Sequence, residues 1–314
     1  MSTDRLTAAA IEAAVNQVLA GTPVTHAAAA IATHPTVLTD ALEVYHQAGR
    51  QALNCFAPGW WQVYIRFTSW EEAERTFADH IAPLLRHAES DRVVTAWWFI
   101  RKHPSWRLRI HPGTPRRATF PPTWTFSSRP ARSAETMMFG DDPGMDIAHT
   151  LFCGDSRNII TIYGGHEAIL GRREMSVLLC STLMRAAGLE WYEQADVWHR
   201  ITQDRPLPGN IHHDNVNTLA AQLTPLLLAE TTPDGPLLGT NGPLAKTAEW
   251  FEVFRRAGDN LGTAAREGRL SRGLRDVISY QTIFHLNRLG VPTRHQCILA
   301  AAAKTAILTV HETE

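Results

Sequence analysis

Residues Trp60–Phe67 read WWQVYIRF and decide the fold class, because apolar and polar side chains alternate there with the period of a half-buried strand. Val63 and Ile65 share one side of such a strand. Ser69 and Glu72 follow at the spacing of a capping box and predict that a helix begins directly after the strand. This step from strand to helix indicates the start of the main domain.

Further along the chain, strands come first and helices follow. Two more strands are predicted over residues 93–101 and 106–111, and residues 112–130 are predicted to form a long loop or an edge hairpin. Helical spacing dominates from Arg172 onward, with predicted helices at 174–187, 215–229, 244–265, 273–289 and 294–310. Because βαβ alternation is missing, we predict an α+β fold with an antiparallel or mixed sheet packed against helices.

The N-terminal region has a different pattern, with short helical stretches separated by breaks such as Gly21-Thr22-Pro23. We therefore expect an N-terminal helical subdomain over residues 1–53 and a catalytic domain over residues 54–314. The spacing around His34-Pro35-Thr36 is compatible with a helix-turn-helix, but the second helix is not basic. Packing or peptide docking is favoured over DNA binding for this subdomain.

Composition excludes several classes of function. The chain has 314 residues with 30 Lys and Arg against 31 Asp and Glu, so its net charge of −1 disfavours a nucleic-acid binder. Its four cysteines are far apart and lack metal-ligand spacing, which predicts a reduced, cytoplasmic protein. The sequence has no export signal, no run of 18 apolar residues and no nucleotide-binding or zinc-protease motif. The cluster His212-His213-Asp214 favours a solvated loop over a metal site, so we expect neither cofactor nor metal.

Several segments, taken in order, carry a family resemblance. They read WWQVYIRF at 60–67, WWFIRK at 97–102, WRLR at 106–109, GMDIAH at 144–149, DVWHR at 196–200 and IFHLNRLG at 283–290. In this order the segments resemble the thiopeptide-type bacteriocin biosynthesis proteins, which are related to the glutamate-eliminating C-terminal domain of lantibiotic dehydratases. The resemblance implies one of two reactions: elimination of glutamate from a glutamylated Ser or Thr, or a [4+2] aza-cycloaddition between two dehydroalanines.

Three departures from the eliminating relatives favour the cyclisation. Met138 stands where those relatives carry an Arg, three residues after Glu135. Ile283 replaces the first His of their His-x-His-x-Asn-Arg run, and Trp106 replaces the His of their HLRxR strand. Elimination needs a base for the α-proton and cations for the departing carboxylates, so these replacements fit it poorly.

Cyclisation asks instead for a neutral donor that promotes the imidic-acid tautomer of an amide, in a cleft that folds the peptide back on itself. Ser279 and Tyr280 lie just before His285, and we predict these three as the catalytic residues. A packed tyrosine or a core histidine remains the plainer alternative for Tyr280 and His285.

The predicted substrate-binding residues are cationic, acidic or aromatic: Arg107, Arg109, Trp97, Glu135, Asp155, Trp250 and Phe251. Arg107 and Arg109 share a strand face and either contact the substrate or form ion pairs with Glu135 or Asp155. Trp250 and Phe251 line a cleft or pack in the core.

The resemblance thus implies a cofactor-independent pyridine synthase that acts on a modified precursor peptide, with loss of water and of the leader peptide. Two alternatives stay open: a stand-alone glutamate-elimination lyase, and a non-catalytic leader-binding partner in complex with a dehydratase. For leader recognition we expect the helical segment 1–53 and an edge strand. Neither nucleic acid nor a membrane is expected as a partner.

Overall fold

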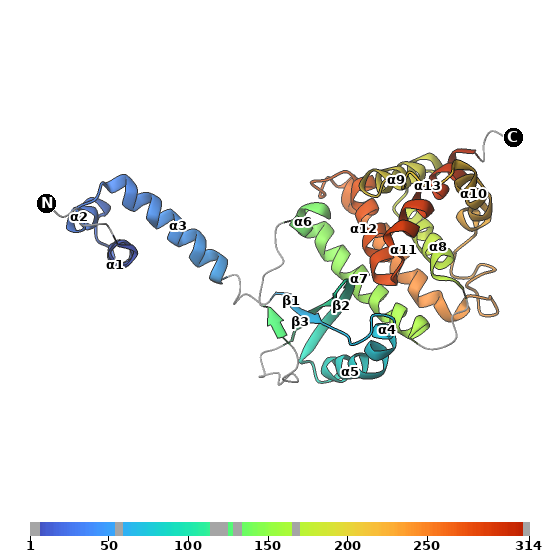
Figure 1. Ribbon diagram of the computed structural model, residues 1–314, viewed down its shortest axis with the longest axis horizontal. Coiled ribbons are helices and arrows are strands. Elements are labelled where there is room, and N and C mark those ends of the chain that lie inside the picture. The colour runs from blue at the N-terminus through green and yellow to red at the C-terminus, as the bar shows by residue number, and fades with distance from the viewer. Residues whose placement is uncertain (1–6, 54–58, 114–124, 128–133, 165–169, 310–314) are drawn as a thin grey trace. The chain divides into compact units, whose positions relative to one another are not determined.

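The computed structural model of the chain describes residues 7–53, 59–113, 125–127, 134–164 and 170–309. It divides the chain into two units, Met1–Gly59 and Trp60–Glu314 (Figure 1). The sequence-based boundary was placed after residue 53. No helix in the described part of the chain is both long and apolar enough to span a bilayer.

The first unit consists of helices α1 (Ala8–Leu19), α2 (Val24–Ala30) and α3 (Pro35–Leu53). Thr7 caps α1, since its hydroxyl accepts a 3.3 Å hydrogen bond from the backbone N–H of Ala10. Small buried side chains hold the helices together, and they are Ala14, Val15, Ala27, Ala28 and Leu38.

The second unit begins with a four-stranded antiparallel sheet, in the order β2-β3-β1-β4. The strands are β1 (Trp61–Ile65), β2 (Val94–Lys102), β3 (Ser105–Pro112) and β4 (Thr125–Ser127). The first three lie where the sequence predicts them, and β4 is an edge strand inside the segment 112–130.

Helices cover both faces of the sheet. On one face, Phe77 packs against Phe99 and Trp106, with ring centroids 5.2 and 5.3 Å apart. Phe77 begins the π-helical segment η1 (Phe77–Ile81), and the neighbouring helices are α4 (Ala73–Thr76) and α5 (Ala82–Ser90). On the other face, Trp98 contacts Phe152 of helix α7 (Asp141–Tyr163) at 5.0 Å. Strong aromatic packing on both sides explains why the centres of β2 and β3, at residues 97–99 and 108–110, are buried.

The rest of the unit is helical and packs behind α7 (Figure 1). Its elements are α6 (Ala134–Met138), α8 (Arg172–Ala186), α9 (Trp191–Asp204), α10 (His213–Leu228), η2 (Ala245–Thr247), α11 (Ala248–Arg266), α12 (Leu274–Leu289) and α13 (Thr293–Thr309). A sheet followed by a helical half confirms the predicted α+β class.

Helices α7 and α9 were not predicted, and α7 shows why. Its sequence contains Pro143, Gly144 and Gly154, which usually interrupt helices. Pro143 is tolerated because it lies in the first turn. A Cβ on Gly154 would lie 2.6 Å from a methyl group of Val253, so this glycine permits the close approach of α11 to α7.

Candidate functional site

Helix α12 carries all three predicted catalytic residues, but its periodicity sends them to different surroundings. Gln281, His285 and Arg288 are spaced by four and three residues, so they share one face, and each is completely buried. Tyr280 is partly exposed on another side of the helix. The structure therefore does not bring Tyr280 and His285 together.

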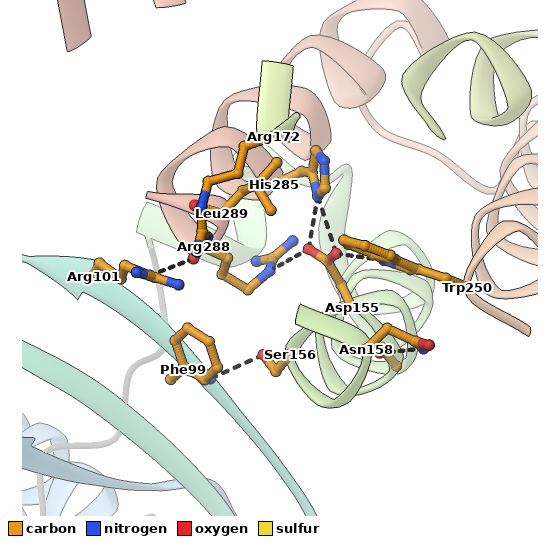
Figure 2. Close-up of polar contacts among 11 residues, drawn as sticks. Phe99, Arg101, Asp155, Ser156, Asn158, Arg172, Trp250, His285, Arg288 and Leu289 are labelled. Carbon is orange, nitrogen blue, oxygen red and sulfur yellow. Dashed lines mark hydrogen bonds and ion pairs between the residues drawn. The ribbon is translucent and has the colours of Figure 1, made fainter. Parts of the chain in front are cut away.

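The buried face of α12 meets Asp155 of α7, whose carboxylate lies at the centre of a polar cluster (Figure 2). His285 Nδ1 lies 2.9 and 3.0 Å from the two carboxylate oxygens, and Arg288 Nε donates to the carboxylate at 2.7 Å. The indole N–H of Trp250 on α11 also donates a hydrogen bond to this carboxylate, at 2.9 Å. We call Asp155, Trp250, His285 and Arg288 the buried cluster.

Electrostatics explain how four polar groups remain stable with no exposed surface. Burial alone would raise the pKa of Asp155, but the charges of His285 and Arg288 outweigh it and lower that pKa. The Arg288 guanidinium also lies 4.0 Å from the centre of the Phe152 ring, a favourable cation–π distance. Asp155 is therefore ionised, and the cluster joins α7, α11 and α12 in the interior.

This arrangement corrects one sequence-based expectation. Asp155 was considered as an ion-pair partner of Arg107 or Arg109, whereas its partners are His285 and Arg288. The rings of Trp250 and Phe254 flank His285 at centroid distances of 6.2 and 4.9 Å. His285 thus faces the helical core and is closed to a peptide substrate in this structure.

The other two predicted catalytic residues differ in accessibility. Ser279 is only 2% exposed, and its hydroxyl donates to the backbone carbonyl of Asp276 at 2.7 Å. Tyr280 is half-buried, and the guanidinium of Arg272 lies 5.0 Å from its ring centre. Of the three, Tyr280 has the most exposed side chain.

Arg107 and Arg109 lie on the sheet face that α7 partly covers, as their spacing predicts. Arg109 is 4% exposed, donates from Nε to Gln62 Oε1 at 3.0 Å and lies 5.0 Å over the ring of Trp98. Arg107 is more open, with its guanidinium 5.7 Å from the ring of Tyr64. Glu135 lies in α6, but its side chain is outside the described residues.

His149 joins this sheet face from α7 and was not among the predicted site residues. Its ring lies 4.3 Å from Trp60 and 6.0 Å from Trp98. Burial, helped by the charges of Arg109 and His111, lowers the pKa of His149 to about 4. Although His149 ends the GMDIAH segment, nothing local in that segment shows that it packs beneath the strands.

The remaining predicted binding residues lie away from the Arg107 face. Phe251 and Trp250 are completely buried in α11, so both are core residues here. Trp97 points to the opposite sheet face from Trp98, is 2% exposed and borders a cavity of about 270 Å³. The guanidinium of Arg157 lies 5.5 Å over its ring.

Two further arginines hold the end of α12, and sequence reasoning did not single them out. Arg101 Nε donates to the carbonyl of Arg288 at 2.7 Å, and Arg172 donates to the carbonyl of Leu289 at 2.8 Å (Figure 2). Both arginines form ion pairs with Glu74. They satisfy carbonyls that lack helical partners at a helix end, and so fix where α12 stops.

In the described part of the chain, no three His, Cys, Asp or Glu side chains are arranged to hold a metal ion. The sheet face with Arg107 and Arg109 offers aromatic surfaces and two arginines, and the half-buried Tyr280 lies on α12.

Comparison with protein families gives a match over residues 60–307 to the model described as lantibiotic biosynthesis dehydratase, C-terminal. No curated protein matches the chain significantly. The matched region excludes the N-terminal helical unit.

Among solved structures, the chain is similar to the tRNA-dependent lantibiotic dehydratase MibB from Microbispora sp. 107891, with a TM-score of 0.57 and 19% identity. The match covers 82% of this chain but 29% of MibB, so the chain spans less than a third of that enzyme. It is also similar to TsrL, with a TM-score of 0.51, 15% identity and coverage of 80% of this chain and 98% of TsrL. At these identities the likeness establishes the fold.

Proposed function

The chain belongs to the family of lantibiotic biosynthesis dehydratase C-terminal domains, and from this premise we propose that it is a thiopeptide pyridine synthase. The proposed substrate is a modified precursor peptide that carries a leader and two dehydroalanines. The enzyme would join the dehydroalanines by a formal [4+2] aza-cycloaddition and release the leader.

The burial of His285 is the observation that carries this proposal. Glutamate elimination needs a base that reaches an α-proton of the peptide. His285 is 0% exposed and engaged with Asp155, while His149 is a weak base because its pKa is lowered to about 4. Neither His285 nor His149 is therefore suited to serve as the base of the eliminating reaction, and the partly exposed His111 on the sheet face is engaged through Nδ1 with the Thr95 hydroxyl at 2.8 Å.

The replaced positions add unequal support. Ile283 is 5% exposed and Met138 packs against the core, so neither supplies a proton or a charge. Trp106, by contrast, faces Phe77 and Phe99, on the opposite sheet face from Arg107. The replacement of His by Trp106 is therefore a packing feature and does not discriminate between the two reactions.

Cyclisation makes weaker demands on acids and bases. One amide takes its imidic-acid form and becomes a 2-azadiene, whose ends bond to the two alkene carbons of the second dehydroalanine. Water and then the leader amide leave, which makes the ring aromatic. Holding the two alkenes together removes much of the entropic barrier, on the order of 7–11 kcal/mol in well-oriented intramolecular reactions. Of the three residues predicted as catalytic, Tyr280 has the most exposed side chain, and we assign its hydroxyl to assist the tautomerisation.

Mass spectrometry of a reaction with purified full-length chain tests the proposal. The substrate is a linear peptide with a leader and two dehydroalanines in the core. We expect a product lighter by the leader amide and one water, together with the free leader carboxamide. A chain that leaves this peptide linear, but releases glutamate from a glutamylated Ser or Thr peptide, would be a lyase.

A tyrosine pair separates catalysis from binding alone. Tyr280→Phe should lower the cyclisation rate by roughly tenfold to a hundredfold, within the range of single acid–base groups. Tyr192→Phe on α9, where the side chain is 54% exposed, should retain the full rate and serves as the control. Equal rates for both variants would remove the assigned role of Tyr280.

A further inference from the structure

Three cavities adjoin one another where α12 ends and α13 begins. Their volumes are about 290, 330 and 140 Å³. The first and second share Arg172 and Gly290 as walls. The second and third share Arg173, Glu174 and His295. Because the cavities share wall residues they lie side by side, and we call this row of three cavities, bordered by α8, α10, α12 and α13, the α12-end groove.

The cationic side chains of this groove divide into two kinds. Arg101 and Arg172 both pair with the single carboxylate of Glu74 and hold the end of α12. Arg75 and Arg173 are exposed, border the groove and form no ion pair with the described residues. These two arginines leave uncompensated positive charge in the first and second cavities.

Two carboxylates also border the groove and reduce this charge. Glu174 folds back over Gly171 at the start of α8, where the N-terminal end of the helix favours a negative charge. Glu71 is exposed at the mouth of the first cavity. Glu74 is paired with Arg101 and Arg172. Altogether four arginines border the groove against three acids, and these residues are Arg75, Arg101, Arg172 and Arg173, and Glu71, Glu74 and Glu174.

The third cavity has a different character. Half of its eight lining residues are aliphatic, and these are Leu219, Leu223, Ile298 and Leu299. Leu219 and Ile298 are only partly buried, so they offer apolar surface to a ligand. Arginine side chains thus border the first and second cavities, the first is lined mainly by polar surface, and the second and third are lined mainly by apolar surface.

We propose that the α12-end groove docks an extended segment of the peptide substrate in which acidic residues adjoin aliphatic ones. The acidic residues would pair with Arg75 and Arg173, and the aliphatic residues would occupy the third cavity. This inference rests on the proposed function, because it assumes that the chain acts on a peptide. It places recognition of the peptide at the end of α12, where Leu289 lies nine residues beyond Tyr280.

Fluorescence anisotropy with a synthetic probe tests the groove. The probe is a fluorescein-labelled decapeptide with glutamates in one half and leucines in the other, and its comparison peptide carries glutamine in place of glutamate. We expect Arg75→Glu and Arg173→Glu each to weaken binding of the glutamate probe by about tenfold, because each reversal turns an attraction into a repulsion. Both variants should bind the glutamine peptide as the wild type does.

Two matched variants complete the design. Arg256 on α11 is also exposed and borders none of the three cavities, so Arg256→Glu should leave binding unchanged. Leu219→Ser should weaken binding of both peptides, since it removes apolar surface from the third cavity. If both arginine variants bind the glutamate probe as the wild type does, the proposal that the groove docks an acidic peptide segment is wrong.

The binding assay is independent of product formation, so the two proposals fail separately. If the groove variants bind the probe like wild type while the wild type still cyclises its substrate, the docking inference is wrong and the proposed function stands. If the probe binds as expected but the doubly dehydrated peptide stays linear, the cyclase assignment is wrong and the groove stands.

Discussion

Replacing Asp155 by asparagine should destabilise the second unit strongly, because the change removes one charge and almost no volume. Asp155 accepts bonds from His285, Arg288 and Trp250, and all four side chains are completely buried. In Asp155→Asn the guanidinium of Arg288 becomes a buried charge without a counter-ion. Breaking a buried pair in this way costs about 3–5 kcal/mol.

This cost converts to a melting temperature. For domains of this size, 1 kcal/mol shifts the midpoint by roughly 2–4 °C, so the expected decrease is on the order of 10 °C. All 10 tryptophans lie at or after residue 60, so their fluorescence reports on the second unit alone. Asp196→Asn is the control: its carboxylate is 29% exposed, pairs with Arg200 at 3.0 Å and should cost at most about 1 kcal/mol.

A second substitution checks the reasoning. Arg288→Met in the Asp155→Asn background removes the stranded cation, and neutral replacements of buried pairs are often well tolerated. The double variant should therefore melt higher than Asp155→Asn alone. If Asp155→Asn melts within a few degrees of Asp196→Asn, or if Arg288→Met gives no recovery, the electrostatic account of the buried cluster is wrong.

The lowered pKa of Asp155 also determines how the stability of the second unit depends on pH. The unfolded carboxyl has a pKa of about 3.9 and the folded one lies lower, so the unfolded state binds the proton first as pH falls. The stabilisation is complete above about pH 5 and is lost as the pH falls through the folded pKa. The gap in melting temperature between wild type and Asp155→Asn should narrow only in strong acid.

Three smaller predictions concern other parts of the second unit. The pKa of His149 in the folded protein is about 4, so between pH 6.5 and 4 only the unfolded state gains a proton at this residue and the protein loses stability. In His149→Phe this loss should be smaller by up to about 3 kcal/mol, as measured by urea unfolding. Gly290→Ala should lower the melting temperature more than Gly268→Ala. Both glycines have positive φ, but only at Gly290 would the added Cβ lie 3.0 Å from the Arg101 guanidinium. Equal decreases in melting temperature would show that this contact is relieved at no cost. Burial raises the pKa of Cys180 to about 12, so this thiol should resist alkylation at pH 8 in the native protein; rapid labelling located by mass spectrometry would contradict its burial.

The sequence predicted those elements whose signals are local. The alternation in Trp61–Ile65 and the spacing along α12 follow directly from the pleat of a strand and the pitch of a helix. Helix α7 was missed because Gly154 is explained only by the packing of Val253 from another helix. Its helical character depends on a neighbour that lies about a hundred residues away in the chain.

The buried cluster was missed for the same reason. Asp155 and Arg288 are separated by 133 residues, and no periodicity in a single sequence relates them. From the sequence, Asp155 is therefore predicted to bind substrate or to pair with the nearer arginines of β3. The face shared by Arg107 and Arg109, in contrast, was predictable because the period of a strand is two.

The contacts along α12 and at its end suggest a role for the buried cluster, whose charged groups are costly to desolvate. An apolar cluster of the same volume would often be at least as stable, so stability alone does not explain it. Asp155 holds His285 and Arg288 by directional bonds, and these fix the rotation of α12 about its axis. Arg101 and Arg172 fix its axial position through the terminal carbonyls. Because the rotation and the axial position of α12 are both fixed, the backbone of Tyr280 is fixed as well, and only its side chain can still move. A reaction that depends on bringing two alkenes together requires a wall of that rigidity.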